Sequence, residues 1–277
     1  MIESGLPPFL KWPGGKRWLI SKHIYCFPRR FHHFFEPFLG GGAAFFSLRP
    51  LQATISDINS ELIALYQVMR DSPLELAQAM RKHQELHCRE YYYSIRIAHY
   101  ADPLQSASRF LYLNRMCYNG MYRVNNSGQF NVPMGTKQNC IYDVDRFSAY
   151  SDLLKSAKII ACDFAATIDR SGENDFVFAD PPYTISHNQN SFIKYNEQLF
   201  TWKDQQRLLE SLCAARSRGA NIIATNASFD MLKEMYIECG FFVKVVDRFS
   251  VMSGRVDKRR KQEELLISSN PFDGTNF

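Results

Sequence analysis

The run Asp180-Pro181-Pro182-Tyr183 contains side chains that could hold a planar amine. Its two prolines fix φ and donate no hydrogen bonds, so the carbonyl groups of Asp180 and Pro181 are held stiffly beside a carboxylate and an aromatic ring. The exocyclic amine of a nucleobase is a poor nucleophile, because its lone pair is delocalised into the ring. The Asp180 carboxylate and the Pro181 carbonyl could accept hydrogen bonds from both hydrogens of such an amine, while Tyr183 stacks on a base swung out of a duplex. A Pro-Pro turn with a packed tyrosine is the plainer alternative.

A glycine-rich turn is the second candidate site. Gly40-Gly41-Gly42 follows a strand candidate and precedes an Ala/Phe-rich helix candidate, so a ligand could approach the backbone and the free amides of the helix N-terminus. Asp57 ends the next strand candidate, where its carboxylate could accept from ribose hydroxyls. Gly14-Gly15-Lys16 lacks the Ser or Thr that follows in a phosphate-binding loop, and the spacing of a dinucleotide fingerprint is absent. A nucleotide site and a tight turn beside an unrelated aspartate both stay open.

The elements that must position these residues alternate between short β-rich runs and helical candidates. Several of the β-rich runs are apolar on consecutive positions, as strands covered on both faces would be. The strand candidates are residues 31–35, 53–56, 158–161, 176–179, 221–225, 241–246 and 265–268. Helical candidates between them are residues 60–70, 203–218 and 229–239. The alternation predicts an α/β fold with a doubly wound, mostly parallel, seven-stranded sheet.

The pattern changes between residue 73 and about residue 150. Two helical candidates, residues 73–87 and 104–116, follow one another with no strand between them. Residues 121–124 and 129–132 then flank an Asn-Asn-Ser-Gly turn, which predicts a β-hairpin. We therefore expect an inserted, mainly helical domain over residues 73–150, and a second domain formed by residues 1–72 and 151–277.

Positive charge is concentrated near the end of the chain. The 277 residues carry 33 Lys and Arg against 28 Asp and Glu, a net charge of +5, and residues 244–262 account for the whole excess. With 45% apolar and 22% charged residues, the chain has the composition of neither a disordered nor a membrane-spanning protein. The N-terminus lacks the pattern of a secretion signal, and seven scattered cysteines argue against a disulfide framework or a structural zinc site. We expect a cytoplasmic protein with reduced cysteines.

Six motifs resemble, in sequence and in order, those of the Dam-type DNA adenine-N6 methyltransferases. Their order, with the cofactor loop first, the recognition lobe next and the catalytic tetrad last, is that of the alpha group. The resemblance extends from about residue 9 to residue 268. The motifs are Lys11-Trp12-Pro13-Gly14-Gly15-Lys16, Phe35-Glu36-Pro37-Phe38-Leu39-Gly40-Gly41-Gly42, Ile55-Ser56-Asp57-Ile58-Asn59, Asn119-Gly120-Met121-Tyr122-Arg123, Phe130-Asn131-Val132-Pro133 and Asp180-Pro181-Pro182-Tyr183.

The resemblance implies S-adenosyl-L-methionine as the methyl donor, no metal, and residues 1–72 and 151–277 as the domain that binds the donor. Asp57 would bind the ribose, the turn of Gly40 to Gly42 would lie beneath the methionine part, and Asp163 with Phe164 would hold the adenine. The cofactor-binding residues implied by motif position are Trp12, Lys16, Phe38, Gly40, Gly42, Asp57, Asp163, Phe164 and Asp180. The implied catalytic residues are Asp180, Pro181, Pro182 and Tyr183.

The recognition hairpin of the family corresponds to residues 118–133, and an Arg on such a ribbon can pair with O6 and N7 of guanine in the major groove. Arg123 is the residue expected to make that contact. The resemblance places Tyr118 and Asn119 at the gap left by a flipped adenine, Met121 against bases, and Lys11 near the first base pair. The implied target is GATC. Met121-Tyr122 and Thr136 depart from the usual pattern of the family, so a related short palindrome or a relaxed site stays open.

Lys258, Arg259 and Arg260 lie between the last two strand candidates, and we expect them to grip phosphates without reading bases. The expected partner is double-stranded DNA, bound by a monomer of bacterial or phage origin. A restriction endonuclease that acts separately is a compatible partner. Alternatives are cytosine-N4 transfer, an RNA or protein amide substrate, and a DNA-binding relative that has lost catalysis. A metal-dependent nuclease is disfavoured because a clustered carboxylate pair with a catalytic Lys is missing.

Overall fold

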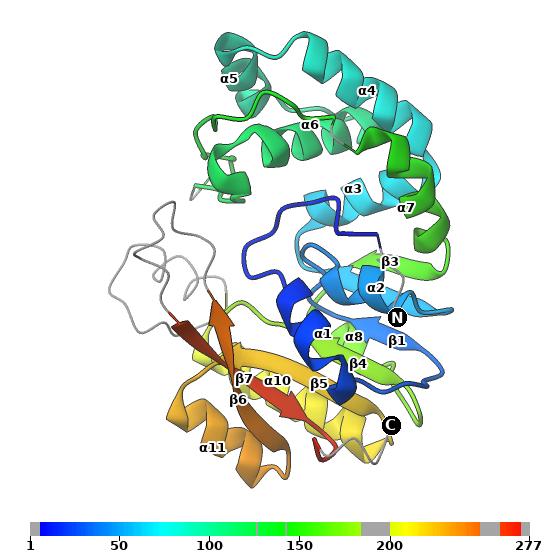
Figure 1. Cartoon of the computed structure of the whole chain (residues 1–277), viewed down its shortest axis with the longest axis vertical. Helices are drawn as coiled ribbons and strands as arrows, with labels where there is room; N and C mark the ends of the chain where they lie inside the picture. The colour runs from blue at the N-terminus through cyan, green and yellow to red at the C-terminus, as the bar shows by residue number, and fades with distance from the viewer. Residues whose placement is uncertain (1–5, 126, 142, 184–199, 250–260, 273–277) are drawn as a thin grey trace. The chain divides into compact units, whose positions relative to one another are not determined.

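The protein is described by a computed structural model that covers residues 6–125, 127–141, 143–183, 200–249 and 261–272. Its strands form one sheet in the order β3-β2-β1-β4-β5-β7-β6 (Figure 1). The strands are β1 (Phe34–Glu36), β2 (Ala53–Asp57), β3 (Ala157–Ala161), β4 (Phe176–Ala179), β5 (Asn221–Ala227), β6 (Phe242–Phe249) and β7 (Lys261–Ser268). The predicted seven-stranded α/β fold is confirmed.

The sheet is mixed, and its register fixes where the candidate site lies. β1 pairs in parallel with β2 and β4, β4 pairs in parallel with β5, and β7 runs antiparallel to both β5 and β6. The carboxyl ends of β1, β4 and β5 therefore meet at one edge, where open α/β sheets bind their ligands. Ala179, the last residue of β4, lies opposite Ala224 of β5. Asp180 and Thr225 consequently leave this register side by side.

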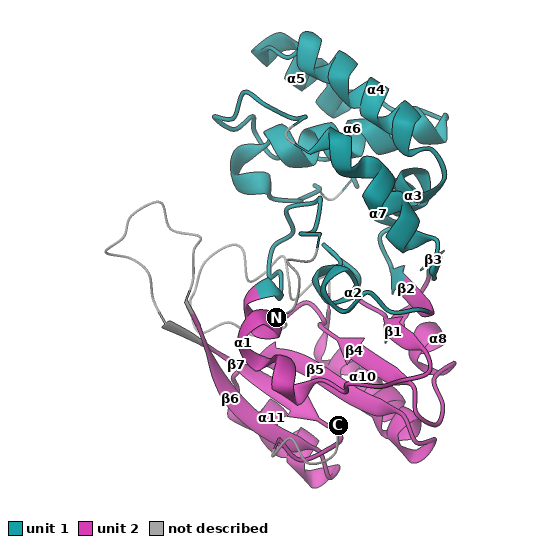
Figure 2. Cartoon of the chain, turned by 45° about the vertical axis from the view of Figure 1, so that its right-hand side comes forward, with its two compact units in different colours: residues 1–17, 39–51, 56–161 teal, residues 18–38, 52–55, 162–277 magenta. Residues whose placement is uncertain are grey.

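Contacts within the chain divide it into two compact units (Figure 2). Unit 1 comprises residues 1–17, 39–51 and 56–161, and unit 2 comprises residues 18–38, 52–55 and 162–277. Unit 1 includes the whole predicted recognition domain, residues 73–150, together with segments on either side of it. Compactness does not show which residues bind a partner, so the predicted domain boundaries stay a prediction.

The helices of unit 1 begin where the sequence supplies caps. Asn59 and Asp102 accept hydrogen bonds from the amides of Leu62 and Gln105, and Pro73 occupies a first position where its missing N–H costs nothing. The buried faces of α3, α4 and α6 then pack together, with α7 against α3. The helices are α2 (Ala43–Leu48), α3 (Ser60–Asp71), α4 (Pro73–Glu85), α5 (Arg89–Ile97), α6 (Pro103–Met116) and α7 (Phe147–Leu154), with 3-10 turns η2 (Tyr118–Gly120) and η3 (Val144–Arg146).

The predicted hairpin of unit 1 is a short one. Gly128 N donates to Asn125 O at the turn, Val124 and Phe130 form one antiparallel bridge, and Asn131 N donates to Arg123 O. The described residues here form this bridge rather than two regular strands. Pro133 has no N–H with which to extend a ladder, which limits the pairing.

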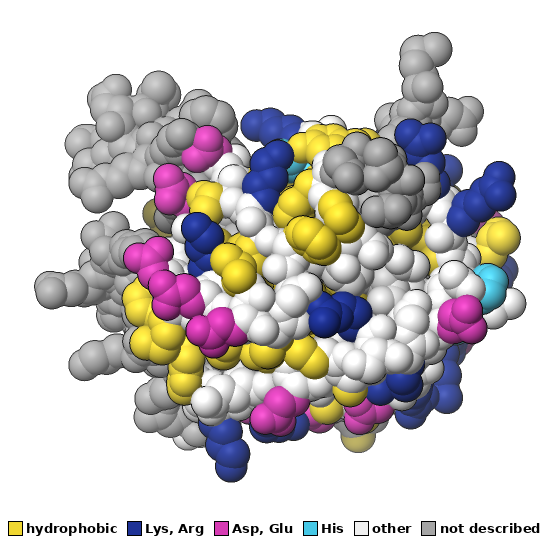
Figure 3. All heavy atoms as spheres, turned by 90° about the horizontal axis from the view of Figure 1, so that it is seen from below, with side chains coloured by type: hydrophobic (Ala, Val, Ile, Leu, Met, Phe, Trp, Pro, Cys, Tyr) yellow, Lys and Arg dark blue, Asp and Glu magenta, His cyan; other side chains and the backbone are white. Residues whose placement is uncertain are grey.

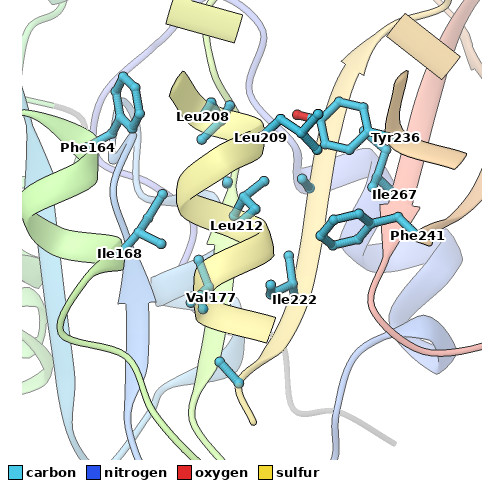
Figure 4. Packing of buried hydrophobic residues seen from close by; sticks show 14 of the residues in the cluster. Phe164, Ile168, Val177, Leu208, Leu209, Leu212, Ile222, Tyr236, Phe241 and Ile267 are labelled. Atoms are coloured by element: carbon cyan, nitrogen blue, oxygen red, sulfur yellow. The ribbon is translucent and has the colours of Figure 1, made fainter. Parts of the chain in front are cut away.

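Unit 2 covers β4 on both faces, because residues of this strand alternate between two apolar layers. Phe176 and Phe178 of β4 lie against Phe27, with ring centroids 5.9 and 5.7 Å apart. On the opposite face, α10 lays Leu208, Leu209 and Leu212 over Val177 and Ile222 (Figure 4). Its helices are α1 (Arg17–His23), α8 (Phe164–Ile168), α10 (Trp202–Ser217) and α11 (Asp230–Glu238), with the 3-10 turn η1 (Ile24–Cys26).

The face shown in Figure 3 carries Lys and Arg side chains interspersed with acidic and apolar ones. Residues 250–260, which contain much of the basic segment predicted at 244–262, lie outside the described residues. No helix within the described ranges is both long and apolar enough to cross a membrane.

His83 is a buried imidazole in the helical part of unit 1. Its side chain is within hydrogen-bonding distance of the Tyr91 hydroxyl (2.8 Å) and the Ser108 hydroxyl (3.3 Å), and its ring stacks on Tyr112 with centroids 4.7 Å apart. Burial and the nearby charge of Lys82 lower the pKa of His83 to about 4. The folded protein therefore resists protonation of this group.

We expect the free energy of unfolding of the wild-type protein to fall in acid, and we expect a smaller fall for His83→Gln. The unfolded chain binds a proton at His83 near the ordinary pKa of about 6.5, and the folded chain binds it near pKa 4. The free energy of unfolding therefore has its full value above about pH 6.5 and falls by about 3 kcal/mol as the pH drops to 4. Urea unfolding between pH 7.5 and 4 should show a shallower decline for His83→Gln. Exposed His99→Gln is the control, and an equal decline for wild type and His83→Gln would contradict the assignment.

Candidate active site

The tetrad predicted from the sequence lies at the carboxyl edge of unit 2. Asp180 follows β4 directly and is half-buried, and Pro181 is buried. The Thr225 hydroxyl of β5 donates to Asp180 Oδ1 at 2.6 Å. Because Thr225 lies on the neighbouring strand, the sheet itself orients the carboxylate.

Tyr183 is tied to the same edge by its hydroxyl group. The hydroxyl donates to Glu264 Oε2 at 2.7 Å, and Arg248 NH1 lies 3.0 Å from Glu264 Oε1. Burial first, and then the negative charges of Asp180 and Glu264, raise the pKa of Tyr183 well above its ordinary value. Tyr183 therefore stays protonated and acts as a donor rather than a base.

The glycine turn in unit 1 is held by Asp57. The Asp57 carboxylate accepts from the amides of Gly40 and Asn59, each at 3.0 Å, and the Tyr66 hydroxyl donates to Gly40 O at 3.1 Å. Burial raises the pKa of Asp57, and the hydrogen bonds from Asn59 and Gly40 oppose that rise. The predicted acid and the predicted loop are thus in direct contact.

Two of the loop glycines need a backbone that other residues avoid. Gly40 has φ +46° and Gly42 has φ +68°, both left-handed. A Cβ on Gly40 would lie 2.6 Å from Cδ1 of Trp12, so the indole ring occupies the space that glycine leaves. Lys16 is 2% exposed and its ammonium donates to Gly14 O at 2.9 Å. The structure therefore brings Trp12, Gly40 and Asp57 together.

The segment predicted to hold an adenine lies in unit 2, next to an arginine that the motifs do not include. Asp163 caps α8 by accepting from Ala165 N at 3.0 Å, and it forms an ion pair of 2.9 Å with Arg207. The Arg207 guanidinium also lies 4.9 Å from the centre of the Phe164 ring. Phe38 stacks on Phe164 with centroids 5.3 Å apart. Phe38 and Arg207 thus both contact Phe164, and Asp163 is held by Arg207.

An aromatic stack in unit 1 joins the predicted cofactor loop to the predicted recognition hairpin. Tyr122 lies 5.3 Å from Trp12 and 5.2 Å from Phe110, with the rings nearly parallel in both pairs. The Tyr122 hydroxyl donates to Glu61 at 3.3 Å. The stack involves Tyr122, one of the positions where the chain departs from the family pattern.

The predicted DNA contacts of unit 1 gather around Lys11. A Cβ on Gly120 would lie 2.5 Å from Cδ of Lys11, so the aliphatic part of the Lys11 side chain packs directly on this glycine. Tyr118 and Asn119, in the same turn, are exposed, and Asn119 has a strained φ of +56°. Burial, and then contact with Lys11, lowers the pKa of Lys137 to about 8. Two cations therefore lie close together on this face.

The remaining predicted contacts are less grouped. Arg123 is half-buried and its Nε donates to Asn131 Oδ1 at 2.8 Å, which ties it across the short hairpin. Met121 is also half-buried. Lys258, Arg259 and Arg260 lie outside the described residues, so their role stays a prediction.

In the parts of the chain that the structure describes, no three His, Cys, Asp or Glu side chains are grouped so that they could hold a metal ion.

Sequence reasoning missed several polar partners of the predicted residues. Thr225 and Arg207 carry no motif signal, although Thr225 stands near the end of a predicted strand. Glu264 offered a usable signal, because a charged residue directly before an apolar strand run suggests a buried, paired carboxylate. It was not identified as a site residue.

The profile of the family described as D12 class N6 adenine-specific DNA methyltransferase matches residues 12–261 of this chain. The chain belongs to this family. Adenine-specific transfer to DNA is thereby favoured over the cytosine, RNA and protein alternatives. Methyltransferases of this kind generally use S-adenosylmethionine.

Full-length relatives of this methyltransferase agree with that placement. The type II methyltransferase M1.LlaDCHI of Lactococcus lactis subsp. cremoris is 35% identical over 276 residues, covering 96% of both chains. M.MjaIII of Methanocaldococcus jannaschii is 34% identical over 94% of this chain and 98% of its own. The DNA adenine methylase of Escherichia coli strain K12 is 31% identical over 95% of each chain. A solved precorrin 8W decarboxylase aligns with a TM-score of 0.42 and 12% identity, too distant to inform fold or function.

Gly40→Ala should displace the Trp12 indole from the glycine turn of this methyltransferase. The Cβ of this alanine would lie 2.6 Å from the indole ring, and the alanine would have to adopt the left-handed φ of Gly40. The free energy of unfolding should therefore fall by about 2 kcal/mol. Urea unfolding and the initial rate of methyl transfer are the measurements. Gly41→Ala is the matched control, because Gly41 does not have a left-handed φ and the nearest atom to its Cβ would be Trp12 Cβ at 3.2 Å. Equal effects of the two variants would contradict the proposed contact.

Proposed function

We propose that the protein transfers the methyl group of S-adenosyl-L-methionine to N6 of an adenine flipped out of duplex DNA, within the sequence GATC. The observation that carries this proposal is the Asp180 carboxylate at the carboxyl edge of the sheet, with Oδ1 held by Thr225 at 2.6 Å. A fixed acceptor beside a stiff Pro181 carbonyl suits an amine that must present its lone pair in one direction.

The residues around the glycine turn fit S-adenosyl-L-methionine. When bound, this donor supplies a methyl group on a sulfonium, which is an excellent leaving group. In unit 1, the Asp57 carboxylate would accept from the ribose hydroxyls, and the turn of Gly40 to Gly42 would lie beneath the methionine part. In unit 2, Asp163 would bind the adenine by hydrogen bond and Phe164 by contact.

The transfer step needs few groups from the protein. Asp180 and Pro181 would accept hydrogen bonds from the two N6 hydrogens and so direct the N6 lone pair toward the methyl group that the sulfonium would release. One N6 proton then leaves to solvent. Because its pKa is raised, the Tyr183 hydroxyl stays protonated. Tyr183 is therefore suited to stack on the base and not to remove a proton from it.

Unit 1 offers the features expected of a DNA-reading surface. Burial, and then the neighbouring Lys11, lower the pKa of Lys137, and a phosphate or a guanine beside the two lysines would offset the repulsion between them. Tyr118 and Asn119 are exposed beside them and could fill the gap left by a flipped adenine. Arg123, fixed through Nε by Asn131, would pair with a guanine.

The decisive experiment is to express the protein in a host without adenine methylation and to map methylated bases by sequencing its DNA. Adenine methylated on both strands of GATC sites is the expected result. Methylation of another short palindrome would overturn the target sequence alone, and methylation of cytosine would overturn the function.

Asp180→Ala should abolish methyl transfer, by roughly a thousand-fold or more, because it removes the acceptor that orients N6. Transfer of a labelled methyl group to a GATC duplex measures the rate, and fluorescence anisotropy measures DNA binding. DNA affinity should stay within about three-fold of wild type, since that affinity comes mainly from contacts of basic side chains with phosphates and not from a carboxylate. Exposed Asp169→Ala is the control. An active Asp180→Ala protein would remove the mechanism.

Arg123→Ala should relax the choice of base at one position of the target. A lost bidentate contact to guanine reduces discrimination there by about 1–3 kcal/mol. Methylation rates across a library of duplexes, each with one base pair of GATC replaced, measure this. The control is Arg81→Ala, because Arg81 is an exposed residue of α4 that pairs with Asp145 of η3. Unchanged discrimination by Arg123→Ala would discard its assigned role.

A further inference from the structure

Glu264 is a buried carboxylate outside the motifs of the sequence. It lies on β7, opposite Ala227 of β5 and Val246 of β6, and its side chain is 3% exposed. A carboxylate in the protein interior is strongly unfavourable unless partners satisfy its oxygens. Oε1 lies 3.0 Å from Arg248 NH1, and Oε2 accepts at 2.7 Å from the Tyr183 hydroxyl. One of the groups that this carboxylate holds therefore belongs to the tetrad.

The hydroxyl group is what distinguishes Tyr183 from a phenylalanine. Stacking on a flat base needs an aromatic ring and no hydroxyl, and the Tyr183 hydroxyl donates to Glu264. A hydrogen bond to a carboxylate is short and directional. It fixes the end of the ring farthest from the backbone, while Pro181 and Pro182 restrain the backbone that carries the ring.

Arg248 supports this arrangement from the outer strand of the sheet. Val246 of β6 faces Glu264 in the register, so Arg248, two residues further on, is its diagonal neighbour. The Arg248 side chain is 18% exposed, so the ion pair is shielded from most solvent. Arg248 supplies the counter-charge and fixes one oxygen of Glu264, which leaves the other oriented toward Tyr183.

We propose that Glu264, held by Arg248, is a positioning residue that fixes the ring of Tyr183 for stacking on the target base. This inference rests on the proposed function, since it takes Tyr183 to contact the base. Glu264 acts through the Tyr183 hydroxyl and touches neither the base nor the methyl donor.

The test is a double-mutant cycle on Tyr183→Phe and Glu264→Leu. Each single variant should lower kcat at saturating DNA and methyl donor roughly ten-fold, because each removes the charge-assisted hydrogen bond between Tyr183 and Glu264. The double variant should lose no more than the worse single variant, since both changes remove the same bond. Exposed Glu263→Leu, on the same strand, is the matched control and should keep the wild-type kcat.

Two further readouts separate positioning from a general loss of structure. With 2-aminopurine at the target adenine, Tyr183→Phe and Glu264→Leu should give brighter complexes than wild type, because an imperfectly stacked base is less quenched. Glu264→Gln keeps an acceptor for the hydroxyl while removing the counter-charge of Arg248. Its kcat should stay within about three-fold of wild type although its thermal unfolding temperature falls. If Glu264→Leu does not fold, the same cycle is run with Glu264→Met.

The inference is overturned if the Glu264 variant has the kcat of Glu263→Leu, or if the double variant shows the product of the two single losses. Tyr183→Ala separates these outcomes from failure of the proposed function. If Tyr183→Ala lowers kcat while Tyr183→Phe and the Glu264 variant do not, only the positioning role is wrong. If Tyr183→Ala leaves kcat unchanged, the stacking of Tyr183 on the base is itself wrong.

Discussion

Burial of β4 on both faces is the constraint on which the catalytic edge depends. Phe176 and Phe178 point into one apolar layer, and Val177 and Ala179 into the other. A shift of one residue would exchange the two layers, so the register against β1 and β5 is strongly specified. Asp180 therefore emerges at a defined level beside Thr225, before any ligand arrives. The packing of Phe176 and Phe178 thus helps to fix the position of the Asp180 carboxylate.

The ion pairs around the candidate site belong to two physical regimes. Arg207 and Asp163 are each about two-fifths exposed, and such a pair contributes only about 0–1 kcal/mol to stability because solvent screens it. Its consequence is mainly the orientation of Asp163 and the cover that Arg207 gives to Phe164. The Arg248–Glu264 pair is shielded, so removing one partner leaves a charge stranded in the interior. Orientation at that pair is accordingly much more rigid.

The seven-stranded sheet could be predicted from the sequence, because apolar strand runs leave local patterns. The apolar run at residues 176–179 matches β4 at both ends. The motif residues could be named from the same kind of local pattern, and the structure brings Asp57 into contact with Gly40 of the glycine turn. Partners contributed by distant strands leave no such pattern. Thr225 and Glu264 are 45 and 81 residues from their partners in the tetrad, and only the register brings them near. The stacking of Tyr122 on Trp12 could not be predicted for another reason, since it depends on how the loop that carries Tyr122 folds back.

The stack of Tyr122 on Trp12 gives the protein a built-in optical reporter. Tyrosine emission overlaps indole absorption, and at a centroid distance of 5.3 Å excitation of Tyr122 passes almost entirely to Trp12. Any event that separates the recognition hairpin from the glycine turn would change both the efficiency of that transfer and the polarity around the indole. Once Trp18 and Trp202 are replaced by Phe, Trp12 is the single indole, and its fluorescence can follow the conformational state of unit 1 in real time without a label.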